Sequence, residues 1–313
     1  MLVLGIDAGG TKTIGQLAGP DARVLLEVRG AGANLQTMGE LEVEKTLHEV
    51  IERALASQPG PLTAICVGMA GVDRPGEADT IRAILARIGR GARSLVVNDA
   101  LIALEAGLPD TPGVVLVAGT GSIAYGRDAN GRAARAGGWG HVLGDEGSGY
   151  WIGRRALHAV MRASDGRGPA TTLSTLVLER YQIERAQQLV HEVYARGARP
   201  VTIAALASIV ERAANAGDAI AAAIVSDAAE ELAAATTSVA DQLQMPQGPV
   251  VLAGNLFRAM PRLDAELRRR LAERLPHASV RALGVEPAQG AVHLALALAA
   301  NRLQVPQYLD ARV

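Results

Sequence analysis

The stretch GIDAGGTKT, residues 5–13, places a carboxylate, adjacent glycines, hydroxyls and a lysine directly after the apolar start MLVL. It differs by one inserted residue from the phosphate loop G-x-x-x-x-G-K-[ST], because Thr11 separates Gly10 from Lys12. That loop must also open into a helix, whose amides complete the phosphate site. The following residues, TIGQLAGPDARVLL, instead have the pattern of a β-hairpin. A classical P-loop is therefore a poor interpretation.

A hairpin turn can still bind phosphate, because adjacent glycines let backbone N–H groups converge on an anion. The candidate contacts in this turn are Gly9, Gly10, Thr11, Lys12 and Thr13. Asp7 would face the same space, and a carboxylate beside phosphates requires a cation, typically Mg²⁺ held through water. An ordinary hairpin turn with exposed polar residues explains the stretch equally well, and Lys12 could simply face solvent.

Two further glycine turns follow strands. GTGSIA, residues 119–124, matches the dinucleotide fingerprint G-x-G-x-x-G/A, but the hairpin pattern after it lacks the helix that such a site needs. A second phosphate-binding hairpin fits better, with Gly119, Thr120, Gly121 and Ser122 as its candidate residues. In the third turn, LAGN, Gly254 and Asn255 would let a flat base lie against backbone. An ordinary strand-to-helix turn accounts for LAGN just as well.

Two acidic positions stand out. Asp99 follows a predicted strand and precedes a helix, where an Asp is most often a helix cap. Phosphoryl transfer to a hydroxyl, however, needs one carboxylate near the acceptor oxygen. GGWGHVLGDEGSGYWIG, residues 137–153, has a composition suited to hydrogen-bonding a polyhydroxylated ligand against an aromatic face. His141 has no second His or Cys nearby, which argues against a metal ligand.

The elements that must position these residues alternate between strand and helix. Three strands form a predicted meander over residues 2–30, and a helix is expected over 41–56. Further strands and helices alternate to residue 118, which predicts a layered α/β domain. The order of strand, glycine turn and hairpin then repeats, which suggests a duplicated core. Residues 150–244 are expected to be mostly helical, and a final helix is expected from residue 290.

Composition narrows the function classes. Among 313 residues, 31 Lys and Arg balance 32 Asp and Glu, and no segment has the basic concentration of a nucleic-acid-binding surface. The single cysteine, Cys66, excludes an internal disulfide and a cysteine-rich zinc site, and it favours a reducing compartment. No signal-peptide pattern or membrane-length apolar run is present. We therefore expect a cytoplasmic protein without nucleic-acid or membrane partners.

The segments GIDAGGTKT, NDA, AGTGS and GGWGHVLGDEGSGYWIG together resemble the N-acetylglucosamine kinase group of the BadF/BadG/BcrA/BcrD ATPase family, within the actin, hsp70 and sugar kinase superfamily. The resemblance covers residues 3–160 and continues through LAGN and PAQGA. It implies an α/β fold of two actin-like, ribonuclease H-like domains, each sheet flanked by helices, around a cleft that closes on ligands. The expected domains are residues 1–117, joined by the C-terminal helix at about 290–313, and residues 118–289 with a helical insertion.

The resemblance also implies roles for individual residues. Asp99 would be the catalytic base, Asp7 would organise hydrated Mg²⁺, and the three glycine turns would bind the phosphates and adenosine of ATP. The implied sugar contacts are Asn34, Asp99, Gly138, Trp139, Gly140 and Asp145. The implied reaction moves the γ-phosphate of ATP to the 6-hydroxyl of N-acetylglucosamine, in an enzyme that forms a homodimer.

Other acceptor sugars and three other classes of protein are alternatives to this function. Glucosamine and N-acetylmuramic acid share the 6-hydroxyl, and one sequence does not separate them from N-acetylglucosamine. ATP-driven activators of 2-hydroxyacyl-CoA dehydratases hold a bridging cluster with two cysteines per subunit, and this chain has one. Another bacterial sugar kinase group with the same D-x-G-G-T-K start carries a cysteine-rich zinc motif, which is absent here. A sugar-responsive regulator would need a DNA-binding module and would have no need for Asp99.

Overall fold

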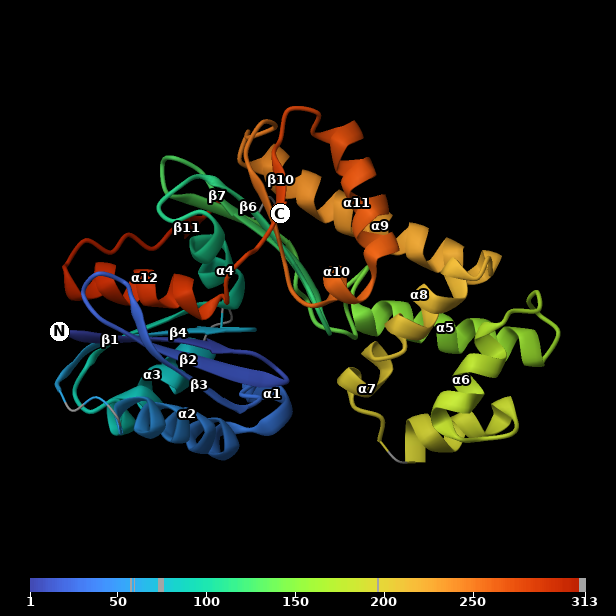
Figure 1. Cartoon of the computed structure of the whole chain (residues 1–313), viewed down its shortest axis with the longest axis horizontal. Helices are drawn as coiled ribbons and strands as arrows, with labels where there is room; N and C mark the ends of the chain where they lie inside the picture. The colour runs from blue at the N-terminus through green and yellow to red at the C-terminus, as the bar shows by residue number, and fades with distance from the viewer. Residues whose placement is uncertain (57, 59, 73–75, 196, 310–313) are drawn as a thin grey trace. The chain divides into compact units, whose positions relative to one another are not determined.

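The computed structural model describes residues 1–56, 58, 60–72, 76–195 and 197–309. The chain forms two compact units (Figure 1). Unit 1 comprises Met1–Val115, Tyr125–Ala134 and Arg281–Val313, and unit 2 comprises Leu116–Ala124 and Arg135–Val280. The end of the predicted 290–313 segment, residues 310–313, lies outside the described residues.

A five-stranded sheet forms the centre of unit 1, in the order β3-β2-β1-β4-β5. Its strands are β1 (Leu2–Ala8), β2 (Lys12–Ala18), β3 (Val24–Ala31), β4 (Leu62–Met69) and β5 (Arg93–Asn98). The first three strands pair antiparallel, which confirms the predicted meander, and β1, β4 and β5 run parallel. The carboxyl ends of these parallel strands therefore share one edge of the sheet.

Helices cover both faces of this sheet (Figure 1). They are α1 (Leu35–Met38), α2 (Glu40–Leu55), α3 (Glu77–Ile88), α4 (Asp99–Gly107) and α12 (Ala288–Ala299). Apolar residues of α2 and α3, such as Leu47 and Ile84, join Leu4 and Ile6 of β1 in one buried cluster. The side chains of a strand alternate between faces, so Gly5 of β1 belongs to the opposite face, which α12 covers.

Two glycines allow α12 to lie directly on backbone. A Cβ at Gly5 would stand 2.3 Å from the amide nitrogen of Val292, and a Cβ at Gly290 would stand 1.9 Å from the carbonyl oxygen of Ile102 in α4. No side chain fits at such distances, so the glycines let α12 contact both β1 and α4. The last helix is thereby built into unit 1, although it starts earlier than the predicted residue 290.

A six-stranded sheet has the order β10-β9-β6-β7-β8-β11. Its strands are β6 (Gly113–Ala118), β7 (Ser122–Arg127), β8 (Arg132–Gly137), β9 (Val250–Ala253), β10 (Val280–Ala282) and β11 (Gln307–Tyr308). The repeated order of strand, glycine turn and hairpin is thus present in β6, β7 and β8. The short strands β10 and β11 had no sequence signal.

Unit 2 is rich in helices, as predicted for residues 150–244. Its helices are α5 (Gly149–Ser164), α6 (Leu173–Tyr181), α7 (Pro200–Ala204), α8 (Ala207–Asn215), α9 (Ala219–Gln242), α10 (Leu256–Ala259) and α11 (Pro261–Arg274), with a 3₁₀ turn at Ala186–Gln188 and a π-helical turn at His191–Ala195. Asp218 fixes the start of α9, because its carboxylate accepts from the amide of Ala221. The same carboxylate accepts from Thr171 and Thr172, and together these bonds lower the pKa of Asp218.

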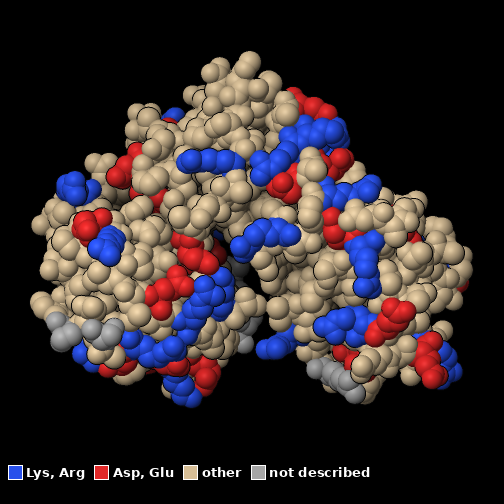
Figure 2. Space-filling view, viewed as in Figure 1, with Lys and Arg blue, Asp and Glu red and all other residues tan. Residues whose placement is uncertain are grey.

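Charges of both signs are interleaved on the face of the molecule in Figure 2. On α11, for example, Arg270 and Arg274 both pair with Glu230 of α9. Within the described part of the chain, no helix combines the length and the apolar character needed to cross a bilayer.

Candidate active site

Asp7 and Asp99 lie at the same edge of the unit 1 sheet. The register pairs Asp7 with Gly68 on β4, and Met69 with Asn98 on β5. Neighbouring strands are about 4.8 Å apart, so the backbones of these two acidic residues are separated by about 10 Å. Asp7 has the same parity in β1 as Gly5, so it belongs to the face covered by α4 and α12.

The two carboxylates affect each other electrostatically. Burial raises the pKa of Asp7 to about 7, and the negative charges of Asp99 and Glu286 act in the same direction, whereas Lys12 opposes them. The ionised form of Asp7 is therefore short of compensating positive charge. A site of this kind favours a cation. No group of three or more His, Cys, Asp or Glu that could hold a metal occurs among the described residues, so a cation here would need water ligands.

The first glycine turn is closed by backbone hydrogen bonds. The amide of Gly9 donates to the carbonyl of Lys12 at 3.0 Å, and the amide of Ala33 donates to the carbonyl of Gly9 at 2.9 Å. The Lys12 side chain is 53% exposed, and its ammonium lies 3.5 Å from the carboxylate of Glu286, the residue before Pro287 at the start of α12. Lys12 thus reaches solvent while it pairs with an acid, and Gly10 and Thr11 are exposed beside it.

Thr13 differs from its predicted place. Its side chain is fully buried in β2, and its hydroxyl has no hydrogen-bond partner. A Cβ at Gly30 would be 3.8 Å from that of Thr13 and 2.9 Å from a methyl group of Val50, so Thr13 lies under α2. Because Lys12 and Thr13 are neighbours in a strand, they belong to opposite faces. The prediction of Thr13 as a phosphate donor is therefore wrong.

Asp99 does not cap α4. Asn98 does so instead: its side-chain oxygen accepts the amide of Ala100 at 2.6 Å. Asp99 is the first helical residue, is partly exposed, and sits where the positive end of the helix dipole favours a negative charge. The capping alternative for Asp99 is thus excluded. Asn34, the implied sugar contact of this unit, is half-buried directly before α1.

The second glycine turn, in unit 2, is bound to the start of α5. The amides of Gly149 and Tyr150 donate to the carbonyls of Gly119 and Thr120, at 2.9 and 3.2 Å. The hydroxyl of Ser122 donates to the carbonyl of Glu146 at 2.7 Å. That hydroxyl proton is therefore already used, and the amide of Gly119 donates to the carbonyl of Gly121 at 2.9 Å. The amides of Thr120 and Gly121 and the hydroxyl of Thr120 are the candidate donors for an anion at this turn.

Asp145 is buried directly against this turn. A Cβ at Gly121 would stand 2.6 Å from its Oδ2 atom. Burial raises the pKa of the Asp145 carboxyl group, and the nearby backbone of Ser122 and Gly140 opposes that rise. Its φ of 58° lies in the left-handed region, which Asp tolerates better than most residues do.

Trp139 presents an aromatic ring in the same unit. The side chain is 53% exposed, and the guanidinium of Arg135 stands 4.3 Å from the ring centroid. Gly138 and Gly140 flank it with positive φ angles of 70° and 86°. The amide of Gly138 donates to the carbonyl of Ser122, which ties this segment to the second glycine turn. His141 stacks edge-on against Tyr150 instead of joining a ligand cluster.

The third turn lies against the second. Gly254 has a φ of 99°, and a Cβ there would be 2.0 Å from the carbonyl oxygen of Ala118 at the end of β6. A Cβ at Gly119 would be 3.4 Å from the side-chain oxygen of Asn255. Unit 2 therefore brings together the second and third turns, the Trp139 segment and Asp145. Unit 1 brings together Asp7, Asp99 and the first turn.

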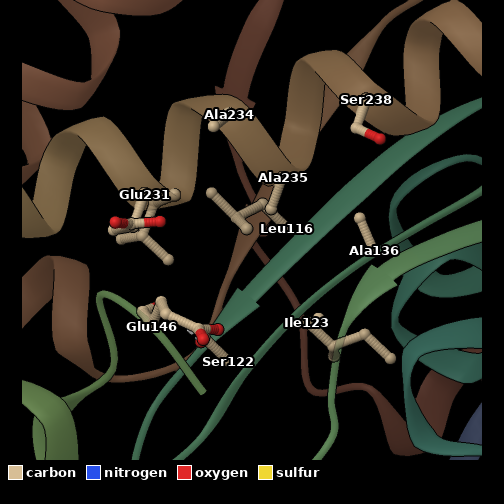
Figure 3. A pocket seen from close by; sticks show the side chains of 11 residues that line it. Leu116, Ser122, Ile123, Ala136, Glu146, Glu231, Ala234, Ala235 and Ser238 are labelled. Carbon is tan, nitrogen blue, oxygen red and sulfur yellow. Dashed lines mark hydrogen bonds between the residues drawn. The ribbon is translucent and has the colours of Figure 1, made fainter. Parts of the chain in front are cut away.

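A cavity of about 260 Å³ lies on one side of the second turn, between the sheet and α9 (Figure 3). Ser122, Glu146 and Glu231 contribute its polar lining, and apolar residues such as Leu116 and Ile123 line the rest. Burial raises the pKa of Glu231, and the charge of Glu146 adds to that effect. The cavity is smaller than most ligand pockets, which enclose about 300–1,000 Å³.

Sequence reasoning missed Glu286. It lies 274 residues from Lys12, so no local pattern links the two. The only available signal was its position immediately before PAQGA, the segment that leads into the last helix.

Comparisons with known proteins find relatives that align with almost the whole chain. The N-acetylmuramic acid/N-acetylglucosamine kinase of Clostridium acetobutylicum is 37% identical, over 94% of this chain and 97% of that protein. The N-acetyl-D-glucosamine kinase of Dictyostelium discoideum is 30% identical, over 94% and 98%. A solved structure from Chromobacterium violaceum, provisionally named an N-acetylglucosamine kinase, has a TM-score of 0.79 at 28% identity and covers 94% of this chain and 98% of its own.

A ROK family glucokinase from Streptomyces griseus, solved with glucose and AMPPNP, has a TM-score of 0.62 at 18% identity, over 96% of this chain and 100% of its own, and shows likeness of fold alone. These likenesses confirm the predicted actin-like α/β fold class. The model of the BadF/BadG/BcrA/BcrD ATPase family matches residues 4–295. The chain belongs to the BadF/BadG/BcrA/BcrD ATPase family.

Proposed function

We propose that this protein transfers the γ-phosphate of ATP to the 6-hydroxyl of an amino sugar, with N-acetylglucosamine as the first candidate. ATP use follows from family membership. The names of the two relatives, both aligned over nearly their whole length, support an amino sugar as acceptor.

The observation that carries the proposal is the place of Asp99. Asn98 provides the side-chain cap of α4, and Asp99 is the first residue of that helix. It stands at the carboxyl edge of the sheet, in the electrostatic field of Asp7. In the proposed reaction Asp99 accepts the proton of the 6-hydroxyl as that oxygen attacks the γ-phosphorus. General-base catalysis of this kind contributes a factor of about 10² to 10⁴.

The remaining roles follow the same scheme. The proposed ATP-binding residues are Gly9, Gly10, Thr11, Lys12, Gly119, Thr120, Gly121, Ser122, Gly254 and Asn255. The proposed sugar contacts are Asn34, Asp99, Gly138, Trp139, Gly140 and Asp145. Asp7 would hold hydrated Mg²⁺, which neutralises phosphate charge during transfer. The raised pKa of Asp7 supports this role, because a bound cation would stabilise the ionised carboxylate.

N-acetylmuramic acid is the second candidate acceptor, because the name of the Clostridium acetobutylicum relative includes it. Glucosamine differs from both in its free amine. The domain division at residues 117/118 and 289/290, the homodimer and a cytoplasmic location also belong to this proposal. Light scattering on the purified protein tests the dimer.

A coupled assay of ADP formation tests the function. Purified protein is offered N-acetylglucosamine, N-acetylmuramic acid, glucosamine and glucose, each with ATP and Mg²⁺. We expect turnover with at least one amino sugar and a product phosphorylated at the 6-oxygen by mass spectrometry and NMR. The Asp99→Asn variant should lose at least about 10²-fold in kcat while its affinity for an ATP analogue stays within about twofold of wild type. Turnover with none of the sugars, or near-normal kcat in Asp99→Asn, contradicts the proposal.

A further inference from the structure

The segment of residues 137–140 leads from β8 into the loop before α5, and all of its residues except Trp139 are glycines. The φ angles are 74° at Gly137, 70° at Gly138 and 86° at Gly140. Glycine loses more conformational freedom on ordering than any other residue, so this backbone is costly to hold in one conformation. Contacts of the Trp139 side chain can offset that cost.

Backbone hydrogen bonds hold the two ends of segment 137–140. The amide of Gly138 donates to the carbonyl of Ser122 at 2.9 Å, and the amide of Gly144 donates to the carbonyl of Gly140 at 2.8 Å. Neither bond involves Trp139, which lies between them and outside any helix or strand. The orientation of its ring therefore depends on side-chain contacts.

Arg135 provides such a contact. It lies on β8, four residues before Trp139, and its guanidinium carbon is 4.3 Å from the centroid of the indole ring. The negative face of an aromatic ring attracts a cation at this distance. Arg135 is half-buried, whereas Trp139 is 53% exposed, so a partly enclosed cation holds a ring that packing leaves accessible.

Trp151 differs from Trp139, although it also faces an arginine. The guanidinium carbon of Arg155 is 4.8 Å from the centroid of its ring. Trp151 belongs to α5, and its amide also donates to the hydroxyl of Ser148, the residue that caps this helix, at 3.2 Å. The backbone of Trp151 is thus ordered by the helix, independently of its arginine.

We propose that Arg135 is a positioning residue for the acceptor sugar: its guanidinium holds the ring of Trp139 and so orders segment 137–140 before the sugar binds. This inference rests on the proposed function for the assignment of Gly138, Trp139 and Gly140 as sugar contacts. A segment that is already ordered loses less conformational entropy on binding, so it binds the sugar more tightly. Arg135 acts on sugar affinity through Trp139 and takes no part in the chemical step.

Steady-state kinetics of the full chain test this role with Arg135→Met, which removes the cation and keeps a long side chain. We expect the KM for N-acetylglucosamine to rise about fivefold, which corresponds to about 1 kcal/mol, the strength of an exposed cation–π pair. The KM for ATP, kcat at saturating sugar and the melting temperature should stay at their wild-type values. Arg135→Lys keeps a cation that the ring attracts, so its sugar KM should lie between those of the wild type and Arg135→Met.

Arg155→Met is the matched control, because it removes the same kind of contact from Trp151 in the same unit. The ion pair of Arg155 with Asp227 is exposed and contributes little to stability. This variant should leave the KM for N-acetylglucosamine unchanged.

Fluorescence anisotropy decay gives a readout that does not depend on turnover. The chain has two tryptophans, so Trp151→Phe leaves Trp139 as the single emitter. In that background Arg135→Met should increase the fast depolarisation of Trp139 in the absence of sugar, because the ring is no longer held. Saturating N-acetylglucosamine should suppress this depolarisation.

Unchanged depolarisation in Arg135→Met would overturn the inference, as would a wild-type KM for N-acetylglucosamine. Parallel increases in the KM for sugar and the KM for ATP, together with a lower melting temperature, would also overturn it, because loss of structure alone explains them. If the wild type phosphorylates none of the amino sugars, the proposed function fails instead. The contact of Arg135 with Trp139 is then judged by depolarisation alone, which supports it if faster and refutes it if unchanged.

Discussion

Replacement of Asp7 by Asn should stabilise the protein in the absence of Mg²⁺, and increasingly so as pH rises. Burial and the nearby charge of Asp99 raise the pKa of Asp7 from 3.8 to about 7, a change of about 3 units. Each unit corresponds to about 1.4 kcal/mol, so the ionised carboxylate costs about 4 kcal/mol in the folded state.

The direction with pH follows from these values. The unfolded chain releases the Asp7 proton near pH 4, whereas the folded protein keeps it until about pH 7. The wild type therefore loses stability as pH rises between these values, and the loss is complete above the folded pKa. Asn does not titrate, so its advantage over Asp should grow by about 3 kcal/mol between pH 5 and pH 8.5.

Urea denaturation at both pH values measures this difference. Asp79→Asn is the control, because Asp79 belongs to the same unit and its side chain is 76% exposed. Mg²⁺ with AMPPNP should stabilise the wild type at pH 8.5 more than it stabilises Asp7→Asn. If the difference in free energy of unfolding between Asp7→Asn and the wild type is the same at pH 5 and pH 8.5, the raised pKa of Asp7 is refuted. If Mg²⁺ with AMPPNP stabilises both proteins equally, the role of Asp7 in holding a cation is refuted.

Two further substitutions test the surroundings of this carboxylate. Glu286→Gln removes a negative charge that raises the pKa of Asp7, so the acidic limb of the pH profile of kcat/KM for ATP should move to lower pH. It also releases Lys12, and the KM for ATP should fall by up to about fivefold, since an exposed ion pair is worth at most about 1 kcal/mol; an unchanged profile and KM would exclude both effects. Gly290→Ala places a Cβ 1.9 Å from a carbonyl oxygen of α4 and should lower the free energy of unfolding by about 1–3 kcal/mol or more. Gly284→Ala, which meets nothing within 4 Å, should leave it nearly unchanged, and equal melting temperatures for the two variants would contradict this close approach.

Local sequence patterns predicted the main helices and strands, because glycine turns, apolar runs and the alternation of apolar and polar residues act on neighbouring residues in the chain. The meander and the second hairpin both appear where the glycine turns indicated them. The helix cap was harder to assign, because Asn98 and Asp99 are adjacent and both residue types can cap. Only the backbone shows that Asn98 has the extended conformation of a cap. The sequence therefore left the role of Asp99 open, and the structure excludes capping.

Other features depend on contacts between distant segments. The sequence predicted Thr13 as a phosphate donor. That prediction is wrong because β2 begins at Lys12, which places the side chain of Thr13 on the buried face of the sheet. The pairing of Lys12 with Glu286 depends on the return of the chain to unit 1. The positive φ of Asp145 has no composition signal of its own, since the glycines around it would permit many turns. These features follow from packing, which a linear pattern does not encode. The roles assigned to the site residues stay predictions until the variants are measured.

The return of α12 to unit 1 also sets an order for biosynthesis. The sheet that carries Asp7 is synthesised first, but the helix that covers β1 and α4 comes from the final segment, Arg281–Val313. On the ribosome, where N-terminal domains usually fold first, the first unit here must wait with one apolar face uncovered. All of unit 2 emerges during that interval and can fold before it. A released chain that ends at residue 280 should therefore protect unit 2 from protease while unit 1 is still cleaved.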